Sequence, residues 1–237
     1  MMLDPLYMMI LLVTLALSGS VSWMVKSRFN AGQKIGISSG LTGADVAKAI
    51  LMDAGITDVK VLQHHGFLSD HYNPLNKTLN LSPEVYNGRN ASAAGVAAHE
   101  VGHAIQHAQG YFPLWLRSFI VPAANLGSNL GPWLVILGIV LMSAGRALGY
   151  SLAVAGVVLF GIATLFTLVT VPVEFDASSR AKKVLARLDI VAQGREYNTV
   201  SGVLFAAGLT YVAAAIGSIM QLFYWAYRAG FIGGRRD

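Results

Sequence analysis

The chain has 237 residues, of which 54% are apolar and 12% are charged, and its mean hydropathy is +0.55. A typical soluble domain carries about 25% charged residues, so this composition excludes a soluble globular protein and a disordered chain, and it indicates an integral membrane protein. The net charge of +5 accompanies no nucleic-acid-binding motif, which excludes a nucleic-acid partner, and the lack of cysteine leaves His, Asp and Glu as the residues that could hold a metal ion.

The first apolar stretch, residues 6–25, is long enough to span about 30 Å of hydrocarbon. Asp4 precedes it, whereas Lys26, Arg28 and Lys34 follow it. Because positive charge favours the cytosolic side, we expect an external N-terminus and a cytosolic segment after the span. Residues 1–28 are therefore predicted to form an N-terminal transmembrane helix.

The segment 29–117 contains all six histidines and is predicted to be a small α+β domain. Thr42 and Asp45 form a capping pair for a helix over 43–54 that ends at Gly55. Short strands are expected at residues 58–62 and at 77–81, and an alanine-rich helix is expected over 91–109.

Three more apolar spans follow. Residues 118–173 are predicted to form a transmembrane hairpin, with spans over 119–143 and 148–171. Residues 174–199 are predicted to be a cytosolic helical segment, and residues 200–237 to be the last transmembrane helix and a tail. On this topology, 13 Lys and Arg residues are cytosolic and 4 are external, which agrees with the positive-inside rule.

The sequence around His99, Glu100 and His103 is an HExxH motif inside the helix predicted over 91–109. Residues four apart lie on one face of a helix, so the two imidazoles could share one Zn²⁺ ion. Glu100 could then act as the general base that takes a proton from a water molecule whose pKa the zinc ion lowers. The alternative is a pair of surface histidines on a helix.

A catalytic zinc site needs a third protein ligand. His107 is about 12 Å from His99 along the helix axis, so one ion cannot bind both, and Gln109 occupies the position where a metzincin has its third histidine. Glu174 is the better candidate, because Pro172 favours the start of a new helix there and a downstream glutamate on a second helix is the gluzincin arrangement. The alternative is a solvated glutamate at a helix start.

Other polar residues are candidates for positioning or substrate-binding roles. Asp176 could accept the second N–H of a ligand histidine, or simply lie at a helix start. His107 could face the substrate or be an ordinary helix-face residue. If the strand over 77–81 is a sheet edge that pairs with an extended substrate, His71 or Tyr72 could stabilise the oxyanion, the alternative being a hydrogen-bonding role in a loop.

Besides the HExxH motif, distinctive segments are distributed along nearly the whole chain, at residues 39–44, 70–74, 81–86, 96–106, 172–175 and 207–214. In these segments the chain resembles the YugP-type family of neutral zinc metallopeptidases of bacterial membranes. The resemblance implies a zinc-dependent membrane peptidase in which His99 and His103 are ligands and Glu100 is catalytic. The layout is also similar to that of the HtpX and CAAX-processing membrane proteases, which have an aspartate where this chain has Ser178.

These features together predict a mainly α integral membrane protein, with about four transmembrane helices and a small α+β zincin-like cytosolic domain. We expect a metalloendopeptidase with one Zn²⁺ per chain in the bacterial plasma membrane, cleaving membrane-associated proteins or peptides at the cytosolic surface. The alternative is a zinc-binding membrane scaffold or chaperone without proteolytic activity, against which the intact Glu100 argues. A transporter is disfavoured because the spans carry essentially no ionisable residues at mid-depth.

Overall fold

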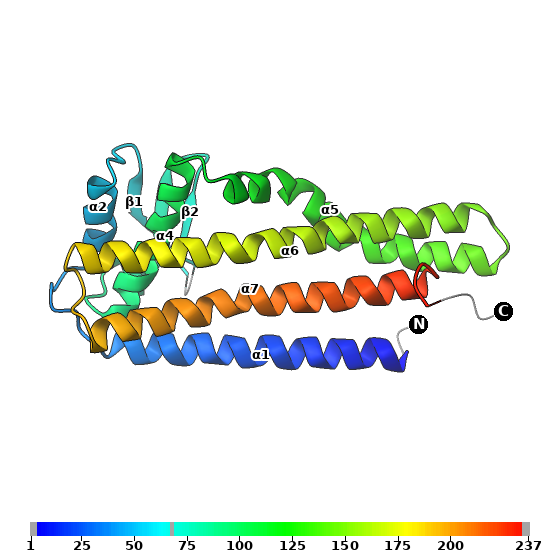
Figure 1. Ribbon diagram of the computed structural model, residues 1–237, viewed down its shortest axis with the longest axis horizontal. Coiled ribbons are helices and arrows are strands. Elements are labelled where there is room, and N and C mark those ends of the chain that lie inside the picture. The colour runs from blue at the N-terminus through cyan, green and yellow to red at the C-terminus, as the bar shows by residue number, and fades with distance from the viewer. Residues whose placement is uncertain (1–3, 67–68, 234–237) are drawn as a thin grey trace. The chain divides into compact units, whose positions relative to one another are not determined.

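Four long helices dominate the computed structural model, which describes residues 4–66 and 69–233 (Figure 1). They are α1 (Pro5–Gln33), α5 (Phe112–Ser143), α6 (Leu148–Arg187) and α7 (Arg195–Arg228), and each is long and apolar enough to cross a membrane. The remaining elements are α2 (Gly43–Asp53), α3 (Pro83–Tyr86), α4 (Ala91–Ala108), β1 (Lys60–Gln63), β2 (His71–Asn73) and β3 (Thr78–Leu81). The prediction of a mainly helical chain with four apolar helices and a small sheet is confirmed.

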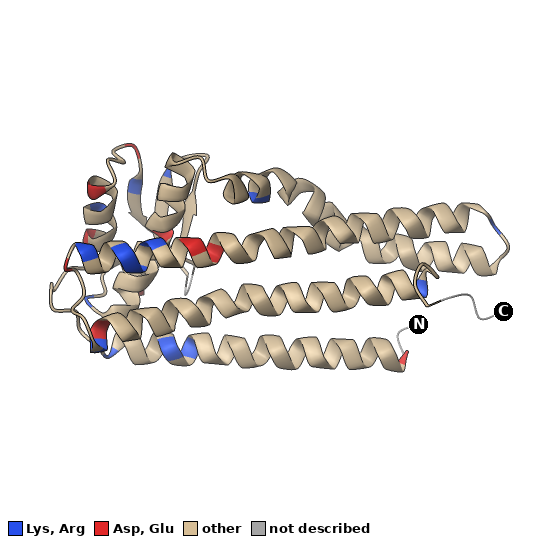
Figure 2. Cartoon of the chain, viewed as in Figure 1, with Lys and Arg blue, Asp and Glu red and all other residues tan. Residues whose placement is uncertain are grey.

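The described residues form two compact units. The helical unit comprises residues 4–19, 116–171 and 211–233, and the mixed unit comprises Ser20–Trp115 and Pro172–Thr210. Charged side chains are concentrated in the mixed unit, whereas long stretches of helix in the helical unit carry none (Figure 2). The two units therefore have the compositions expected of a polar domain and of a group of apolar helices.

Helix α2 begins as the sequence predicts. The Thr42 hydroxyl accepts a hydrogen bond from the Asp45 amide at 3.1 Å, and the Asp45 carboxylate accepts one from the Thr42 amide at 3.1 Å. This reciprocal capping box satisfies main-chain donors that the first helical turn leaves free. At the other end Gly55 has a φ of +68°, a left-handed conformation that glycine adopts without strain.

The sheet has the order β1-β3-β2, with β1 parallel and β2 antiparallel to β3. Strand β3 is therefore central, and the prediction that 77–81 is a sheet edge is wrong. The physical reason is that Leu79 and Leu81 are fully buried in the core, and the central strand of the sheet provides this burial. Strand β2 is one of the two real edges, and its three residues are too few to show a period in the sequence.

The core of the mixed unit surrounds helix α4. This helix packs against α2, α3, β2 and β3, and most of its buried residues are alanine, glycine or serine, which allow close approach. The ends of three long helices complete the core through Phe29 of α1, Leu185 of α6 and Val200 of α7, each at most 2% exposed.

Helix α6 corrects the prediction that a new helix starts at Pro172. The helix is continuous from Leu148 to Arg187, with Pro172 in its interior. A proline removes one main-chain hydrogen bond, but the turns that follow are held by packing, because Val173, Ala177 and Ala181 are completely buried.

Glycines bring α5 and α6 together in the helical unit. A Cβ on Gly127 would lie 2.0 Å from the main-chain oxygen of Leu159, and a Cβ on Gly138 would lie 2.6 Å from the amide nitrogen of Ala153. Small residues of this kind let apolar helices approach closely, as in many membrane helix pairs. The two helices are joined by the short connection of residues 144–147.

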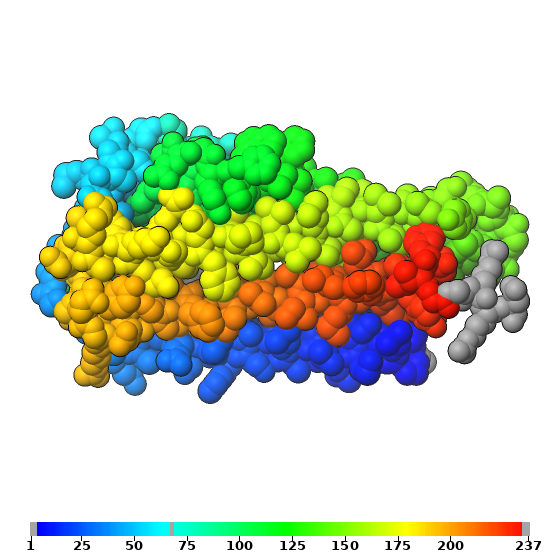
Figure 3. Space-filling model, in the orientation of Figure 1, coloured from blue at the N-terminus to red at the C-terminus, as the bar shows by residue number. Residues whose placement is uncertain are grey.

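Helices α1 and α7 lie side by side in the same unit (Figure 3). The guanidinium of Arg228 donates to Asp4 at 2.9 Å, and the Tyr224 hydroxyl donates to the same carboxylate at 3.2 Å. Further along the pair, the Thr14 methyl group packs against Gly217, where a Cβ would be 2.8 Å away. The first and last helices are thus fixed to each other by an ion pair and a close helix–helix contact.

The capping box makes the stability of the mixed unit pH-dependent. Hydrogen bonds from the side chain and main chain of Thr42 lower the pKa of Asp45, so their contribution is present above the unfolded-state pKa of about 4 and is lost as the pH falls through the lower folded-state value. We expect Thr42→Ala to cost about 1 kcal/mol at neutral pH. The measurement is thermal unfolding of the full chain in detergent at several pH values. A penalty from Asp45→Asn that does not decrease as the pH falls below about 4 would contradict this account.

Candidate metal centre

Helix α4 presents the HExxH motif from within the mixed unit. Its first turn is capped by the Asn90 side chain, which accepts a hydrogen bond from the amide of Ala93 at 3.0 Å. The side chains of His99 and His103 are 13% and 12% exposed, and their rings lie 4.8 Å apart between centroids. The two imidazoles therefore lie on one face of the helix, one turn apart, as the spacing predicts.

Glu174 of helix α6 meets both imidazoles. Its Oε2 atom is 3.2 Å from Nε2 of His99 and 3.5 Å from Nε2 of His103, and its side chain is 2% exposed. In a tetrahedral zinc site with bonds of 2.0–2.1 Å, neighbouring ligand atoms lie about 3.3 Å apart. The two imidazole nitrogens and the carboxylate oxygen thus fit the donor set and the spacing of a zinc site, with all three groups within 4.8 Å of one another.

The position of Glu174 beside the two imidazoles depends on a close approach of α4 and α6 at Gly102. A Cβ at this position would lie 2.7 Å from the main-chain oxygen of Ala177 and 3.1 Å from its Cα. Backbone atoms cannot yield as a flexible side chain can, so any larger residue at position 102 would push α6 away. The glycine inside the HExxH motif is therefore what allows Glu174 to reach the two histidines.

The second ring nitrogen of each histidine also has a partner. Nδ1 of His99 is 3.1 Å from Oγ of Ser178, and Nδ1 of His103 is 3.0 Å from Oε1 of Gln106. When Nε2 binds a metal ion, Nδ1 carries the proton and donates it in these bonds. Burial alone would lower the pKa of His103, but the hydrogen bond with Glu174 and the charges of Glu100 and Glu174 outweigh it, and the pKa is raised.

Asp176 contacts the site through Gln106, and not through a hydrogen bond from a ligand histidine, which was one of its two predicted roles. The Gln106 amide donates to Asp176 and to the main-chain oxygen of Val173, each at 2.8 Å. Asp176 is also paired with Arg180, whose guanidinium lies over the Tyr111 ring at 5.5 Å from the centroid. Gln106 is fully buried, so this chain of contacts holds its side chain in one orientation against His103.

Glu100 is 8% exposed, and its carboxylate accepts a hydrogen bond from the amide of Tyr72 at 3.0 Å. Tyr72 belongs to the edge strand β2, so its N–H points away from β3 and toward α4. The candidate general base therefore extends from the HExxH helix to the outer edge of strand β2.

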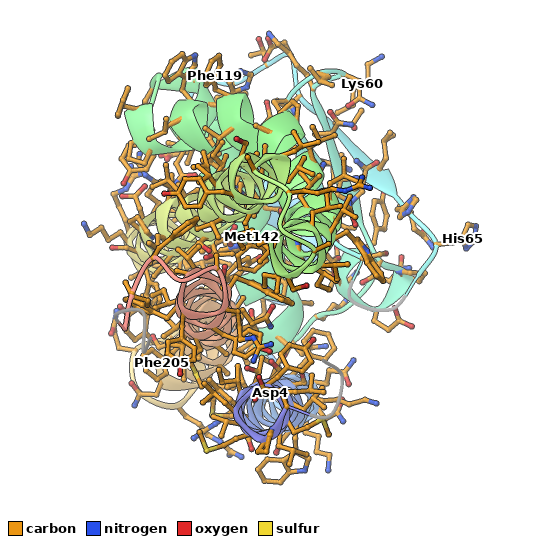
Figure 4. All side chains as sticks on the ribbon, turned by 90° about the vertical axis from the view of Figure 1, so that its right-hand side faces the viewer. Asp4, Lys60, His65, Phe119, Met142 and Phe205 are labelled. Carbon is orange, nitrogen blue, oxygen red and sulfur yellow. The ribbon has the colours of Figure 1, made fainter. Side chains whose placement is uncertain are left out.

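The other predicted residues lie outside the three-residue cluster. Nδ1 of His107 is 2.9 Å from the Tyr72 hydroxyl, which places this histidine beside β2. His71 donates from Nδ1 to the Ser69 carbonyl at 2.8 Å, so it has the loop hydrogen bond that the sequence offered as its alternative. His65 points outward from the loop after β1 (Figure 4).

Sequence reasoning missed Gln106 and Ser178 as histidine partners. Both could have been found from helix spacing, because Gln106 follows His103 by three residues and Ser178 follows Glu174 by four. Residues at these spacings share a helix face. The resemblance to the HtpX and CAAX-processing proteases drew attention to position 178, but only the contact with His99 shows what the Ser178 hydroxyl does.

The hydroxyl of Ser178 can be tested without disturbing the packing. We expect Ser178→Ala to weaken zinc binding about 10- to 100-fold, the usual effect of losing a hydrogen bond to a metal-bound histidine. The measurement is competition for zinc with a chelator of known affinity. The matched control is Ser201→Ala in the same unit, because the Ser201 hydroxyl is buried without a partner. Equal zinc affinity in both variants would contradict the assigned role.

Comparison with known proteins agrees with the resemblance inferred from the sequence. The family described as "Putative neutral zinc metallopeptidase" matches residues 7–230. The chain is 43% identical over 217 residues to the "Putative membrane protease YugP" of Bacillus subtilis (strain 168), and the alignment covers 92% of this chain and 93% of that relative. No solved structure matches the chain significantly.

Proposed function

Because this chain belongs to the neutral zinc metallopeptidase family, we propose that it is a membrane-embedded metalloendopeptidase that uses one zinc ion per chain. The observation that carries the proposal is the convergence of His99, His103 and Glu174, with Glu100, the residue after His99, also buried on the same helix. A site that only held metal would have no use for a second carboxylate next to its first ligand.

The chemistry divides between the metal and the protein. When bound, zinc would polarise the scissile carbonyl and lower the pKa of water. Glu100 would take the proton from the attacking water and return it to the leaving amine. Ser178 and Gln106 would hold the two imidazoles in the orientation that ligation needs, through the Nδ1 contacts described above.

Strand β2 is where an extended substrate would bind. Peptides add to free sheet edges through main-chain hydrogen bonds, and β2 is the edge that contacts α4. The Tyr72 amide now bonded to Glu100 would donate instead to a substrate carbonyl, which would free the carboxylate for water. The Tyr72 hydroxyl and His107 lie at the same edge and are candidates for oxyanion or substrate contacts.

The same proposal places the four apolar helices in the bacterial plasma membrane and the mixed unit on the cytosolic side. It is supported by the length and composition of the helices, by the 13-to-4 distribution of Lys and Arg, and by the name of the relative as a membrane protease. Substrates would then be membrane-associated proteins or peptides cleaved at the cytosolic surface.

The assignment of base and ligand can be tested with two variants. We expect Glu100→Gln to retain about one zinc per chain and to lose turnover, because an amide cannot accept the proton. Glu174→Ala should lose both the zinc ion and the turnover, because the two imidazoles would be the only ligands left. The measurements are elemental analysis of purified protein and cleavage of casein. Near-normal cleavage by Glu100→Gln would contradict the assignment of Glu100 as the base. A zinc-loaded wild-type protein that cleaves nothing would favour the alternative of a zinc-binding scaffold.

The sidedness is tested by reporter fusions. A reporter fused after Tyr111 should behave as cytosolic, and one fused before Asp4 should be translocated, because most Lys and Arg residues flank the cytosolic ends of the proposed spans. Alkaline phosphatase and green fluorescent protein give opposite readouts in such fusions. Translocation of the Tyr111 fusion would place the metal centre on the external face instead.

A further inference from the structure

A cavity of about 330 Å³ lies among α1, α5, α6 and α7 within the helical unit. Its volume is in the range of ligand sites in proteins. Phe160 and Phe166 form part of the wall, and no charged residue lines it. The polar lining residues are Thr14, Asn125, Ser128, Thr167, Ser218 and Gln221.

Some of these polar groups are satisfied by the helices themselves. The Thr167 hydroxyl donates to the main-chain oxygen of Thr164 at 2.7 Å, and the Ser218 hydroxyl donates to the Thr164 hydroxyl at 2.8 Å. Such bonds are the usual way for hydroxyl groups to be accommodated in apolar helices. These residues by themselves would need no ligand.

The carboxamides are different. Asn125 is exposed and Gln221 is partly buried, and neither side chain forms a hydrogen bond within residues 4–66 and 69–233. The Thr14 hydroxyl is buried, also without a partner among these residues. Polar groups without partners are strongly disfavoured in an apolar environment. Two amides and a hydroxyl from three helices facing one cavity therefore point to a partner that supplies both donors and acceptors.

The cavity also lies far from the end of the helical unit. Thr14 of α1 follows Asp4 by ten residues, and Ser218 precedes Arg228 by ten residues on α7. At 1.5 Å per residue, both are about 15 Å from the Asp4–Arg228 ion pair, which is half the thickness of the hydrocarbon core. In the proposed membrane orientation, the cavity is near the middle of the bilayer.

We propose that this cavity binds the exposed main chain of a membrane-spanning segment of the substrate, an inference that rests on the proposed peptidase function. Each peptide group brings one donor and one acceptor, which match the carboxamides of Asn125 and Gln221. A lining without charge offers nothing to a phosphate headgroup or a metal ion. The ligand is therefore neutral and rich in amides.

The need for unpaired main-chain donors and acceptors restricts the ligand to a particular class of membrane-spanning segment. An intact transmembrane helix satisfies its own main-chain groups and has none to offer. A segment interrupted by glycine or proline near its middle exposes free carbonyl and amide groups at the depth of the cavity. The protein would thus recognise membrane segments with a broken helix at the bilayer centre.

The chain contains no cysteine, so Ser218→Cys introduces a single thiol into the cavity. We would reconstitute this variant, in the Glu100→Gln background, into phosphatidylcholine nanodiscs and measure alkylation by N-ethylmaleimide, which needs the thiolate and hence water. Two synthetic peptides of about 20 apolar residues are added, one of Leu and Ala and one with a central Gly-Pro-Gly. The interrupted peptide should slow alkylation in a saturable way, and the Leu-Ala peptide should not.

The carboxamides are then removed one at a time. Asn125→Leu and Gln221→Leu should each weaken binding of the interrupted peptide about 5- to 150-fold. Asn129→Leu is the matched control, because Asn129 bonds to its own helix and does not line the cavity.

Three results would overturn the proposal: no alkylation without peptide, equal protection by both peptides, or an equal loss of affinity in the Asn129 control. The test needs no catalysis. Failure of the peptidase assignment is therefore recognised separately, by the casein assay.

Discussion

The contact between Gly102 of α4 and Ala177 of α6 is the constraint on which the metal centre depends. A side chain at position 102 would collide with main-chain atoms of α6, and Glu174 lies on that helix three residues before Ala177. The two bonds that orient the imidazoles also rely on this contact, since Ser178 is on α6 and Gln106 is anchored to α6. One close approach thus brings the ligands together and fixes their orientation.

Burial explains why the cluster suits a cation. Glu174 is 2% exposed and lies between two imidazoles, and a buried carboxylate is tolerated only with compensating charge or hydrogen bonds. Neutral imidazoles offer limited compensation, whereas a divalent ion compensates fully and releases any proton held by the histidines. Because the ligands come from two helices, metal binding would also stabilise the mixed unit.

The carboxamide beside the metal centre and the two at the cavity differ in their hydrogen bonding. In the mixed unit, Gln106 has partners for its amide nitrogen and its oxygen, as expected for a group that must hold one orientation. In the helical unit, the carboxamides of Asn125 and Gln221 face a cavity and bond to nothing in the described part of the chain. The bonded carboxamide holds one orientation, whereas the unpaired ones are available to the ligand that we propose.

The sequence by itself determined the four apolar helices, the capping box at Thr42 and the spacing of His99 and His103, because each depends on residues close together in the chain. It also proposed Glu174, partly from a helix start at Pro172 that the structure does not have. Tertiary packing decided what adjacency in the chain cannot: the central place of β3, the continuity of α6 through Pro172, and the partners of the two histidines. These features depend on which buried surfaces meet, and that is set by contacts between residues far apart in the sequence.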